Sequence, residues 1–393
     1  MRDSFKDVAA NANNPKFQNM ISRINPLYQR NNDLRSDFER DYTRVIHSRG
    51  YRRMKHKTQV FFSPENDHIC TRIEHVALVE SISYTIAKYL GLNVELTRAI
   101  ATAHDIGHAP FGHQGERILS EISERDLGKT FWHERNGLEI VDNIELLDTP
   151  KGGLENLDLT YAVRDGIISH CGEIDENNLK PRDEFINLDD YTTVNQYAPY
   201  TWEGCVVKIA DKISYLGRDI ADAVTLGLIN DNLDELYEIL GMDRVNKINN
   251  TIVTNDFIVD LCENSTPEKG FTFSEETFQK IKRLKEYNYK NIYFNHKTRI
   301  PNEYFKLVIN KIYDLLKTAY TDREEAESIC KLLVEDFDDY LINYWTKERP
   351  EHNTNKAIFN IDKEEDYLQA IIYYISGMTD NYAIKMFNKI INF

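Results

Sequence analysis

Cysteine, positive charge and long apolar runs are all scarce in this sequence. Its 393 residues include five cysteines, no two of which form a C-x-x-C pair, so we expect neither a disulfide framework nor a thiolate zinc site. The odd count favours a reducing compartment. No apolar run approaches the roughly 18 residues of a membrane-spanning helix, and residues 1–6 lack the apolar stretch of a secretory signal. We therefore expect a soluble protein of the cytoplasm that binds no membrane.

Positive charge is outnumbered along the chain as a whole. Lys and Arg total 48 against 64 Asp and Glu, which gives a net charge of −16. A surface that coats nucleic acid needs broad positive potential, so we expect nucleic-acid binding to be absent or secondary. Between Thr43 and Pro64, however, there is no acidic residue and there are six basic ones: Arg44, Arg49, Arg52, Arg53, Lys55 and Lys57. This stretch is either a solvated basic loop or a local site for a polyanionic ligand.

Helical periodicity, in contrast, is abundant. Apolar residues recur at steps of three and four from Val76 to Leu90, which predicts an amphipathic helix that ends at Gly91. A second helix is predicted to begin near Val94 and to end before Gly107 and Pro110, which cannot continue a helix comfortably. Strand signals are few and short. The predicted fold class is all-α, or mainly helical.

The length suits two domains or one large helical unit. We divide the chain into a polar N-terminal arm (1–35), a core (36–230) and a helical C-terminal region (231–393) packed on the core. The arm is expected to be loosely ordered. Within the core, residues 173–199 are polar and contain Pro181 and Pro199, so they are predicted to form a long surface loop.

The histidines are unevenly distributed. Of eleven, five lie between positions 75 and 133: His75, His104, His108, His113 and His133. Imidazole and carboxylate ligands together suit a divalent ion such as Mn, Mg, Fe, Ni or Zn. Neighbouring residues of a helix point about 100° apart, so His104 and Asp105 can share one ion only where the helix ends. Gly107 and Pro110 provide that end, and His75 on the preceding helix could reach the same point.

A fourth ligand has to come from elsewhere in the chain. Asp211 follows a mostly apolar segment (Val206–Ala210), where burying a carboxylate is costly unless it is paired or bound to a metal. The alternative to a metal site is that each histidine is a hydrogen-bonded residue of the core and that the aspartate caps a helix or forms an ion pair. The adjacent His-Asp pair, followed by two further histidines around a Gly/Pro turn, favours a metal site.

At this point the sequence resembles a known family. Arg72-Ile73-Glu74-His75, then His104-Asp105, then Asp211 resemble the H…HD…D signature of HD-domain phosphohydrolases. Three longer segments resemble the deoxynucleoside-triphosphate triphosphohydrolases, a branch that includes bacterial dGTPases and the vertebrate SAM-and-HD-domain dNTPases. These segments are RMKHKTQV (53–60), HDIGHAPFGHQGE (104–116) and Asp211…Tyr215…Asp219. The resemblance covers residues 36–230 well, and beyond them it extends only to helical character.

The resemblance implies a role for each matching position. The metal ligands would be His75, His104, Asp105 and Asp211. The catalytic group would be His113, with Glu116 and His133 orienting and tuning it. The substrate contacts would be Arg72, His108 and Lys212 at the phosphates, Tyr215 and Asp219 at the deoxyribose, and Gln59 at its 3′-hydroxyl.

The implied reaction is metal-assisted attack of water at the α-phosphorus of a dNTP. His113 would protonate the leaving 5′-oxygen, and the products would be a deoxynucleoside and tripolyphosphate. The resemblance also implies a homo-oligomer, a tetramer or hexamer, with a nucleotide activator bound at subunit interfaces.

Three positions depart from the bacterial pattern. Lys212 and Arg218 stand where many bacterial members have Asp and His, and Glu134 stands where they often have Asn. These choices are closer to the vertebrate enzymes and leave base preference and regulation open; dGTP, among other dNTPs, is the expected substrate. Two alternatives remain: an HD phosphohydrolase that acts on another nucleotide phosphate ester, and a non-catalytic nucleotide-sensing protein.

Overall fold

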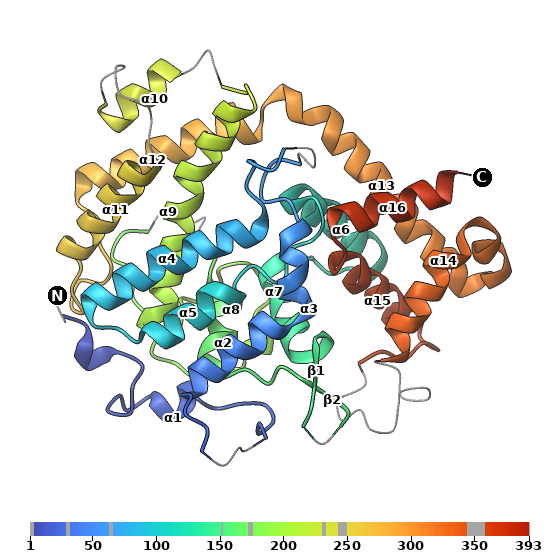
Figure 1. Ribbon diagram of the computed structural model, residues 1–393, viewed down its shortest axis with the longest axis horizontal. Coiled ribbons are helices and arrows are strands. Elements are labelled where there is room, and N and C mark those ends of the chain that lie inside the picture. The colour runs from blue at the N-terminus through green and yellow to red at the C-terminus, as the bar shows by residue number, and fades with distance from the viewer. Residues whose placement is uncertain are drawn as a thin grey trace.

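The structure is a computed structural model that describes residues 4–28, 32–62, 66–150, 152–171, 176–229, 233–242, 250–343 and 358–392. Within these ranges the chain is mainly helical, as predicted, and strands β1 (Leu146–Asp148) and β2 (Leu154–Asn156) form its one small antiparallel sheet (Figure 1). The helices are α1 (Phe17–Met20), α2 (Asp37–His47), α3 (Arg49–Arg53), α4 (Arg72–Leu90), α5 (Val94–Ala103), α6 (Gly112–Leu127), α7 (His133–Glu139), α8 (Tyr161–Ser169), α9 (Trp202–Thr225), α10 (Leu233–Leu240), α11 (Asn250–Asn264), α12 (Glu275–Asn288), α13 (Arg299–Thr321), α14 (Arg323–Ile342), α15 (Glu364–Ser376) and α16 (Asp380–Ile391). In the described parts of the chain we find no helix that is long and apolar enough to cross a membrane.

The two helices predicted from periodicity are present with the expected ends. At the start of α4 the Glu74 carboxylate accepts the backbone N–H of Thr71 at 2.8 Å, and α4 ends at Gly91, whose φ of 81° suits glycine. At the start of α5 the side chain of Asn93 caps two backbone N–H groups. His104 follows directly after the last residue of α5.

Helix α9 crosses the core and packs against α4, α5 and α8 (Figure 1). Its apolar side, which includes Val206, Val207, Ala210 and Ile213, is almost completely buried. Burial of this side fixes the rotation of the helix. Asp211 is therefore held facing the helices that carry His75 and His104.

The N-terminal arm differs from its prediction. Residues 4–28 lie on the core, and Phe5 is fully buried between the rings of Trp202 and Phe271, with centroids 5.0 and 5.1 Å away. The backbone N–H of Ala10 donates to the carboxylate of Glu203 at 2.9 Å. A few apolar side chains and one buried carboxylate order this polar segment, so the expectation of a loose arm is wrong for the described residues.

The described part of the predicted loop, residues 176–199, is irregular apart from one 3-10 turn, Leu188–Asp190, and an antiparallel bridge between Leu179 and Phe271. It is more than a surface feature, because Arg182 forms an ion pair with Asp165, which is fully buried in α8.

The C-terminal helices form two groups. Helices α11 and α12 contact α9, and α13 leads from them to the α14–α16 group, where it also packs against α6 (Figure 1). The C-terminal region therefore contacts helices of the core on two sides. The domain boundaries at residues 35 and 230 stay predictions.

Candidate active site

Two imidazoles are oriented by the ends of their own helices. At the end of α5, Nδ1 of His104 lies 2.7 Å from the carbonyl oxygen of Ala101, and at the end of α8, Nδ1 of His170 lies 2.7 Å from that of Ile167. A carbonyl can only accept, so each Nδ1 carries the proton. Nε2 of His104 is buried and makes no hydrogen bond to any described residue. Such an oriented, unsatisfied nitrogen is suited to bind a metal.

The four predicted metal ligands converge on this nitrogen. Nε2 of His75 lies 2.9 Å from Oδ1 of Asp211 and 3.5 Å from Oδ2 of Asp105. Nε2 of His104 lies 3.4 Å from Oδ1 of Asp105 and 3.9 Å from Oδ1 of Asp211. His75, His104 and Asp211 form one group that could hold an ion, and His104, Asp105 and His170 form an overlapping one. The nitrogen and oxygen donors fit a divalent metal.

The charges around Asp105 keep it ionised. Burial alone would raise the pKa of this carboxyl, but the neighbouring side chains of His104, Arg72 and His108 hold it well below its usual range. Burial, together with the neighbouring rings of His104 and His133, lowers the pKa of His170 to about 3, so this imidazole is neutral at physiological pH. Neutral imidazole and ionised carboxylate are the forms that bind a metal.

Arg72 joins this donor set to the neighbouring loop. Its guanidinium is 1% exposed, and Nη1 donates to Oδ2 of Asp105 at 2.7 Å. Nη2 donates to the backbone carbonyls of Thr58 and Gln59 at 3.2 and 3.1 Å. Arg72 lines the cavity, as its predicted phosphate contact requires, but it also positions Asp105 and the loop that carries Gln59.

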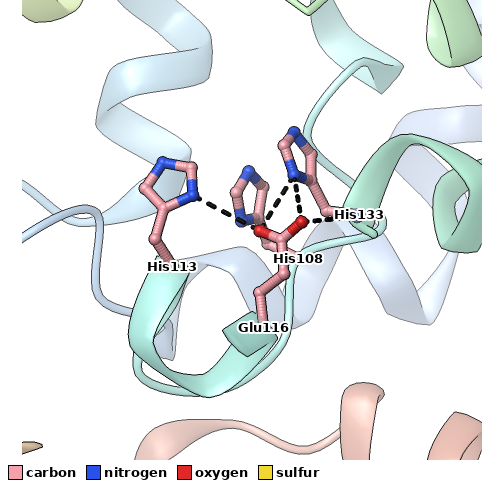
Figure 2. Close-up of side chains that lie close together, drawn as sticks. All are labelled: His108, His113, Glu116 and His133. Atoms are coloured by element: carbon pink, nitrogen blue, oxygen red, sulfur yellow. Dashed lines mark hydrogen bonds and ion pairs between the residues drawn. The ribbon is translucent and has the colours of Figure 1, made fainter. Parts of the chain in front are cut away.

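A second cluster lies beside the first and is shown in Figure 2. His113, on the first turn of α6, has Nδ1 3.3 Å from Oε2 of Glu116, one turn further along the helix. Glu116 also faces His133 at the start of α7, with 3.1 Å from ring Nδ1 to either carboxylate oxygen. The ring of His108 stacks on that of His133, with centroids 3.8 Å apart. His113 is the most accessible member, with 62% of its side chain exposed.

The second cluster holds a positive charge on His133 next to a negative charge on Glu116. Burial alone would lower the pKa of His133, but the negative charges of Glu134 and Glu116 outweigh it and raise the pKa to about 10. Burial alone would raise the pKa of Glu116, but His133 and His113 hold it well below its usual range. At neutral pH the cluster therefore contains a carboxylate and an imidazolium behind the exposed ring of His113.

One cavity of about 360 Å³ connects the two clusters. Of the thirteen predicted site residues, ten line it: Gln59, Arg72, His75, Asp105, His108, His113, His133, Asp211, Tyr215 and Asp219. His104 and Glu116 lie behind the wall and reach it through the contacts given above. A volume of this size suits a small-molecule ligand.

Lys212 is the one predicted residue that the structure does not bring to this cavity. It is buried and lines a separate small cavity with Lys208, Ile213 and Phe278. Lys212 follows Asp211 on α9, and successive helix residues point about 100° apart. Asp211 faces the metal ligands while Lys212 lines this other cavity, so the phosphate contact of Lys212 stays a prediction.

The turn after α5 fits tightly against α7. A Cβ atom on Gly107 would lie 2.0 Å from the carbonyl oxygen of His133 and 2.3 Å from the backbone nitrogen of Gly137. Side-chain atoms never approach backbone so closely, so only glycine fits here. This contact sets the position of the His104–His113 turn relative to His133.

Several residues of the cavity were not identified from sequence. His170 belongs to the metal-ligand group, and its signal, a polar ring at the end of the apolar Ile167-Ile168 segment, resembles the signal that identified Asp211. The C-terminal region contributes Tyr289, Tyr293, Thr298 and Asn302 to the wall. The Tyr293 hydroxyl donates to Asp219, and burial raises the pKa of that carboxyl to about 7. Nothing local in the sequence marks these four residues.

Comparison with known proteins adds independent information. The family model for the HD domain matches residues 72–216, a range that begins at Arg72 and contains all four predicted metal ligands. Similar proteins include three bacterial relatives, each named deoxyguanosinetriphosphate triphosphohydrolase-like protein. The protein of Caldanaerobacter subterraneus subsp. tengcongensis is 32% identical over 91% of this chain and 86% of its own length. The Clostridium tetani protein is 33% identical over 93% and 88%, and the Rickettsia prowazekii protein is 29% identical over 98% of both chains.

Proposed function

Because this chain belongs to the family of deoxyguanosinetriphosphate triphosphohydrolase-like proteins and contains an HD domain, a helical phosphohydrolase unit, we propose that it hydrolyses dNTPs, dGTP among them, at the α-phosphorus. The products are a deoxynucleoside and tripolyphosphate. The observation that supports this proposal is that one cavity contains two clusters. One is a set of donors for a divalent cation, and the other is the exposed His113 with the carboxylate of Glu116 and the imidazolium of His133 beside it.

The donor set is proposed to hold one divalent cation. His75, His104, Asp105 and Asp211 supply two imidazole nitrogens and two carboxylates, which suit Mn, Mg, Fe, Ni or Zn. When bound, such an ion acts as a Lewis acid toward phosphoryl oxygens and activates water. The protein holds ligands of this set in place through the end of α5, which orients His104, and through Arg72, which holds Asp105.

His113 is proposed to be the general acid. The 5′-oxygen of a deoxyribose is a poor leaving group, so cleavage needs a proton as the bond to phosphorus breaks. The exposed ring of His113 can approach that oxygen, while the carboxylate of Glu116, 3.3 Å from Nδ1, orients the ring. The charged ring of His133 in turn keeps Glu116 ionised.

The remaining wall is proposed to bind the nucleotide. His108 and Arg72, on the side of the metal ligands, face the phosphates. Tyr215 and Asp219 follow Asp211 at steps of four on α9, so the three share one face and border the deoxyribose. Gln59, whose Oε1 is buried without a hydrogen bond to any described residue, reads the 3′-hydroxyl. We also propose that the chain forms a homo-oligomer with a nucleotide activator between subunits, which sedimentation with and without dNTPs would test.

Product analysis tests the reaction. The purified protein is incubated with Mn²⁺ or Mg²⁺ and each dNTP, singly and mixed, and the products are separated by anion-exchange chromatography. We expect a deoxynucleoside and tripolyphosphate, formed more slowly by on the order of 10²–10⁴-fold in the His113→Ala variant under the same conditions. Monophosphate with pyrophosphate, or turnover of a different phosphate ester alone, would instead support a different HD phosphohydrolase. Turnover that occurs only in mixtures would reveal the activator.

A further inference from the structure

The C-terminal helices reach the cavity through one buried carboxylate. Asp380, the first residue of α16, is 3% exposed. Its Oδ1 accepts the backbone N–H of Phe111, and its Oδ2 accepts the backbone N–H of Thr58, each at 2.8 Å. One side chain thus joins two loops that are separated by more than fifty residues, and it comes from a helix near the other end of the chain.

Both loops carry groups of the proposed active site. Thr58 directly precedes Gln59, and Phe111 precedes Gly112 and His113 at the start of α6. The loops are in contact, because a Cβ atom on Gly112 would lie 2.9 Å from the carbonyl oxygen of Gln59. The position of Asp380 therefore determines how the backbone of Gln59 lies relative to that of His113.

Phe111 itself needs support. Its φ of 64° is in the left-handed region, which is strained for a residue other than glycine and persists only where the surroundings enforce it. Asp380 holds the N–H of Phe111, and the ring of Phe305 on α13 stacks on the Phe111 ring, with centroids 4.3 Å apart and planes at 5°. The conformation that starts α6 is thus enforced by helices of the C-terminal region.

A second link runs from the end of α15 to the same two loops. Buried Lys57, one residue before Thr58, donates through Nζ to the carbonyl oxygens of His108 and Ser376. Asn136 donates to the carbonyl of Gly107 at 2.6 Å and to the Ser376 hydroxyl at 3.1 Å. The end of α15 and the start of α16 therefore form one rigid attachment for the loop of Gln59 and the turn of His108–Phe111.

We propose that Asp380 is a positioning residue, and that α15 and α16 set the distance between the group that reads the 3′-hydroxyl, Gln59, and the general acid, His113. This inference rests on the proposed function for the roles of those two residues. In this proposal the C-terminal region positions active-site loops, a role that could not be inferred from its helical character alone.

The first test measures substrate discrimination. Asp380→Ala removes both acceptors, and Asp380→Asn keeps one. As the matched control, Asp366→Ala removes a carboxylate from the first turn of α15 that accepts the backbone N–H of Asn360 at 3.0 Å and lies away from the cavity. The ratio of kcat/KM for a dNTP to that for its 2′,3′-dideoxy analogue is compared among the variants, since this ratio does not depend on the fraction of protein that is folded.

We expect kcat of Asp380→Ala to fall by on the order of 10²-fold, the usual effect of a small misplacement of reacting groups. The discrimination ratio should fall by about tenfold, the value of one hydrogen bond. Asp380→Asn should lie between the wild type and Asp380→Ala, and Asp366→Ala should keep both values. A fall in kcat with an unchanged discrimination ratio in Asp380→Ala would overturn the positioning role and leave only a structural one.

The second test does not depend on turnover. Hydrogen–deuterium exchange, resolved to single amides by mass spectrometry, should be faster at Thr58 and Phe111 in Asp380→Ala than in the wild type and in Asp366→Ala. Unchanged exchange at both amides would overturn the proposal. If the wild type hydrolyses no dNTP, the proposed function fails, while exchange at these two amides still decides whether Asp380 holds the loops.

Discussion

Glu116 binds His133 twice: one carboxylate oxygen accepts the backbone N–H at 3.0 Å, and both oxygens lie 3.1 Å from ring Nδ1. The first contact fixes the start of α7, and the second fixes the ring. Helix α6 and helix α7 are therefore joined at the residue that also faces His113.

This pair leads to a prediction about pH. The pKa of His133 is raised from its usual 6.5 to about 10, so the stability that its charge contributes is fully present below pH 6.5 and is lost as the pH rises through 10. Glu116→Gln removes a neighbouring negative charge, so the pKa of His133 should fall and this loss should move to lower pH. NMR titration of the imidazole measures the shift. Glu121→Gln, an exposed change on the same helix, is the control, and a His133 pKa that stays near 10 in Glu116→Gln would contradict this account.

His113→Ala should separate catalysis from binding. Its ring is exposed and contacts Glu116 rather than the metal ligands. We expect metal content and nucleotide affinity close to those of the wild type, and a rate lower by on the order of 10²–10⁴-fold, the usual contribution of a general acid. Metal analysis and single-turnover kinetics check this. Loss of the metal in His113→Ala would show that the two clusters have been assigned the wrong roles.

Asp105→Ala should remove the metal and weaken the fold together. It takes away a ligand, and it leaves the buried guanidinium of Arg72 without its carboxylate partner. Breaking a buried ion pair on one side typically costs about 3–5 kcal/mol of unfolding free energy. Metal content and chemical denaturation measure the two effects. The double variant Asp105→Ala/Arg72→Met removes the unpaired charge as well and should recover stability but not metal.

Gly107→Ala should test how closely the turn and α7 must fit. Backbone atoms of His133 and Gly137 occupy the space of the new methyl group, and neither can rotate away. We expect a loss of about 1–3 kcal/mol or more in the unfolding free energy. At Gly377 the nearest atoms lie 3.4 Å from an added Cβ, so Gly377→Ala should change stability by less than about 1 kcal/mol. Equal stabilities of the two variants would mean that the turn can shift.

The sequence predicted the features that local pattern controls. Apolar spacing located α4 and α5, and an unexplained carboxylate in an apolar segment identified Asp211. The same reasoning could have identified His170, a polar ring that follows the apolar Ile167-Ile168 segment at the end of α8. The phosphate contact of Lys212 came from the resemblance alone, which takes no account of the rotation of about 100° between successive helix residues.

Contacts between distant segments could not be predicted in this way. Asp380 accepts hydrogen bonds from Thr58 and Phe111, which lie 322 and 269 positions before it in the chain. Hydrophobic periodicity cannot predict contacts over such distances in sequence. The N-terminal arm is ordered because Phe5 packs between Trp202 and Phe271. The composition of the arm is mainly polar, so it does not indicate this contact.

The placement of His104 and His170 has an electrostatic consequence. Each is the residue at which its helix ends, so the C-terminal ends of α5 and α8 point into the same volume. Aligned peptide dipoles give a helix a partial negative charge of about half an electron at that end. Two such ends add to the charges of Asp105 and Asp211 without adding a titratable group. The backbone thus contributes a negative potential that attracts a cation at any pH at which the helices are folded.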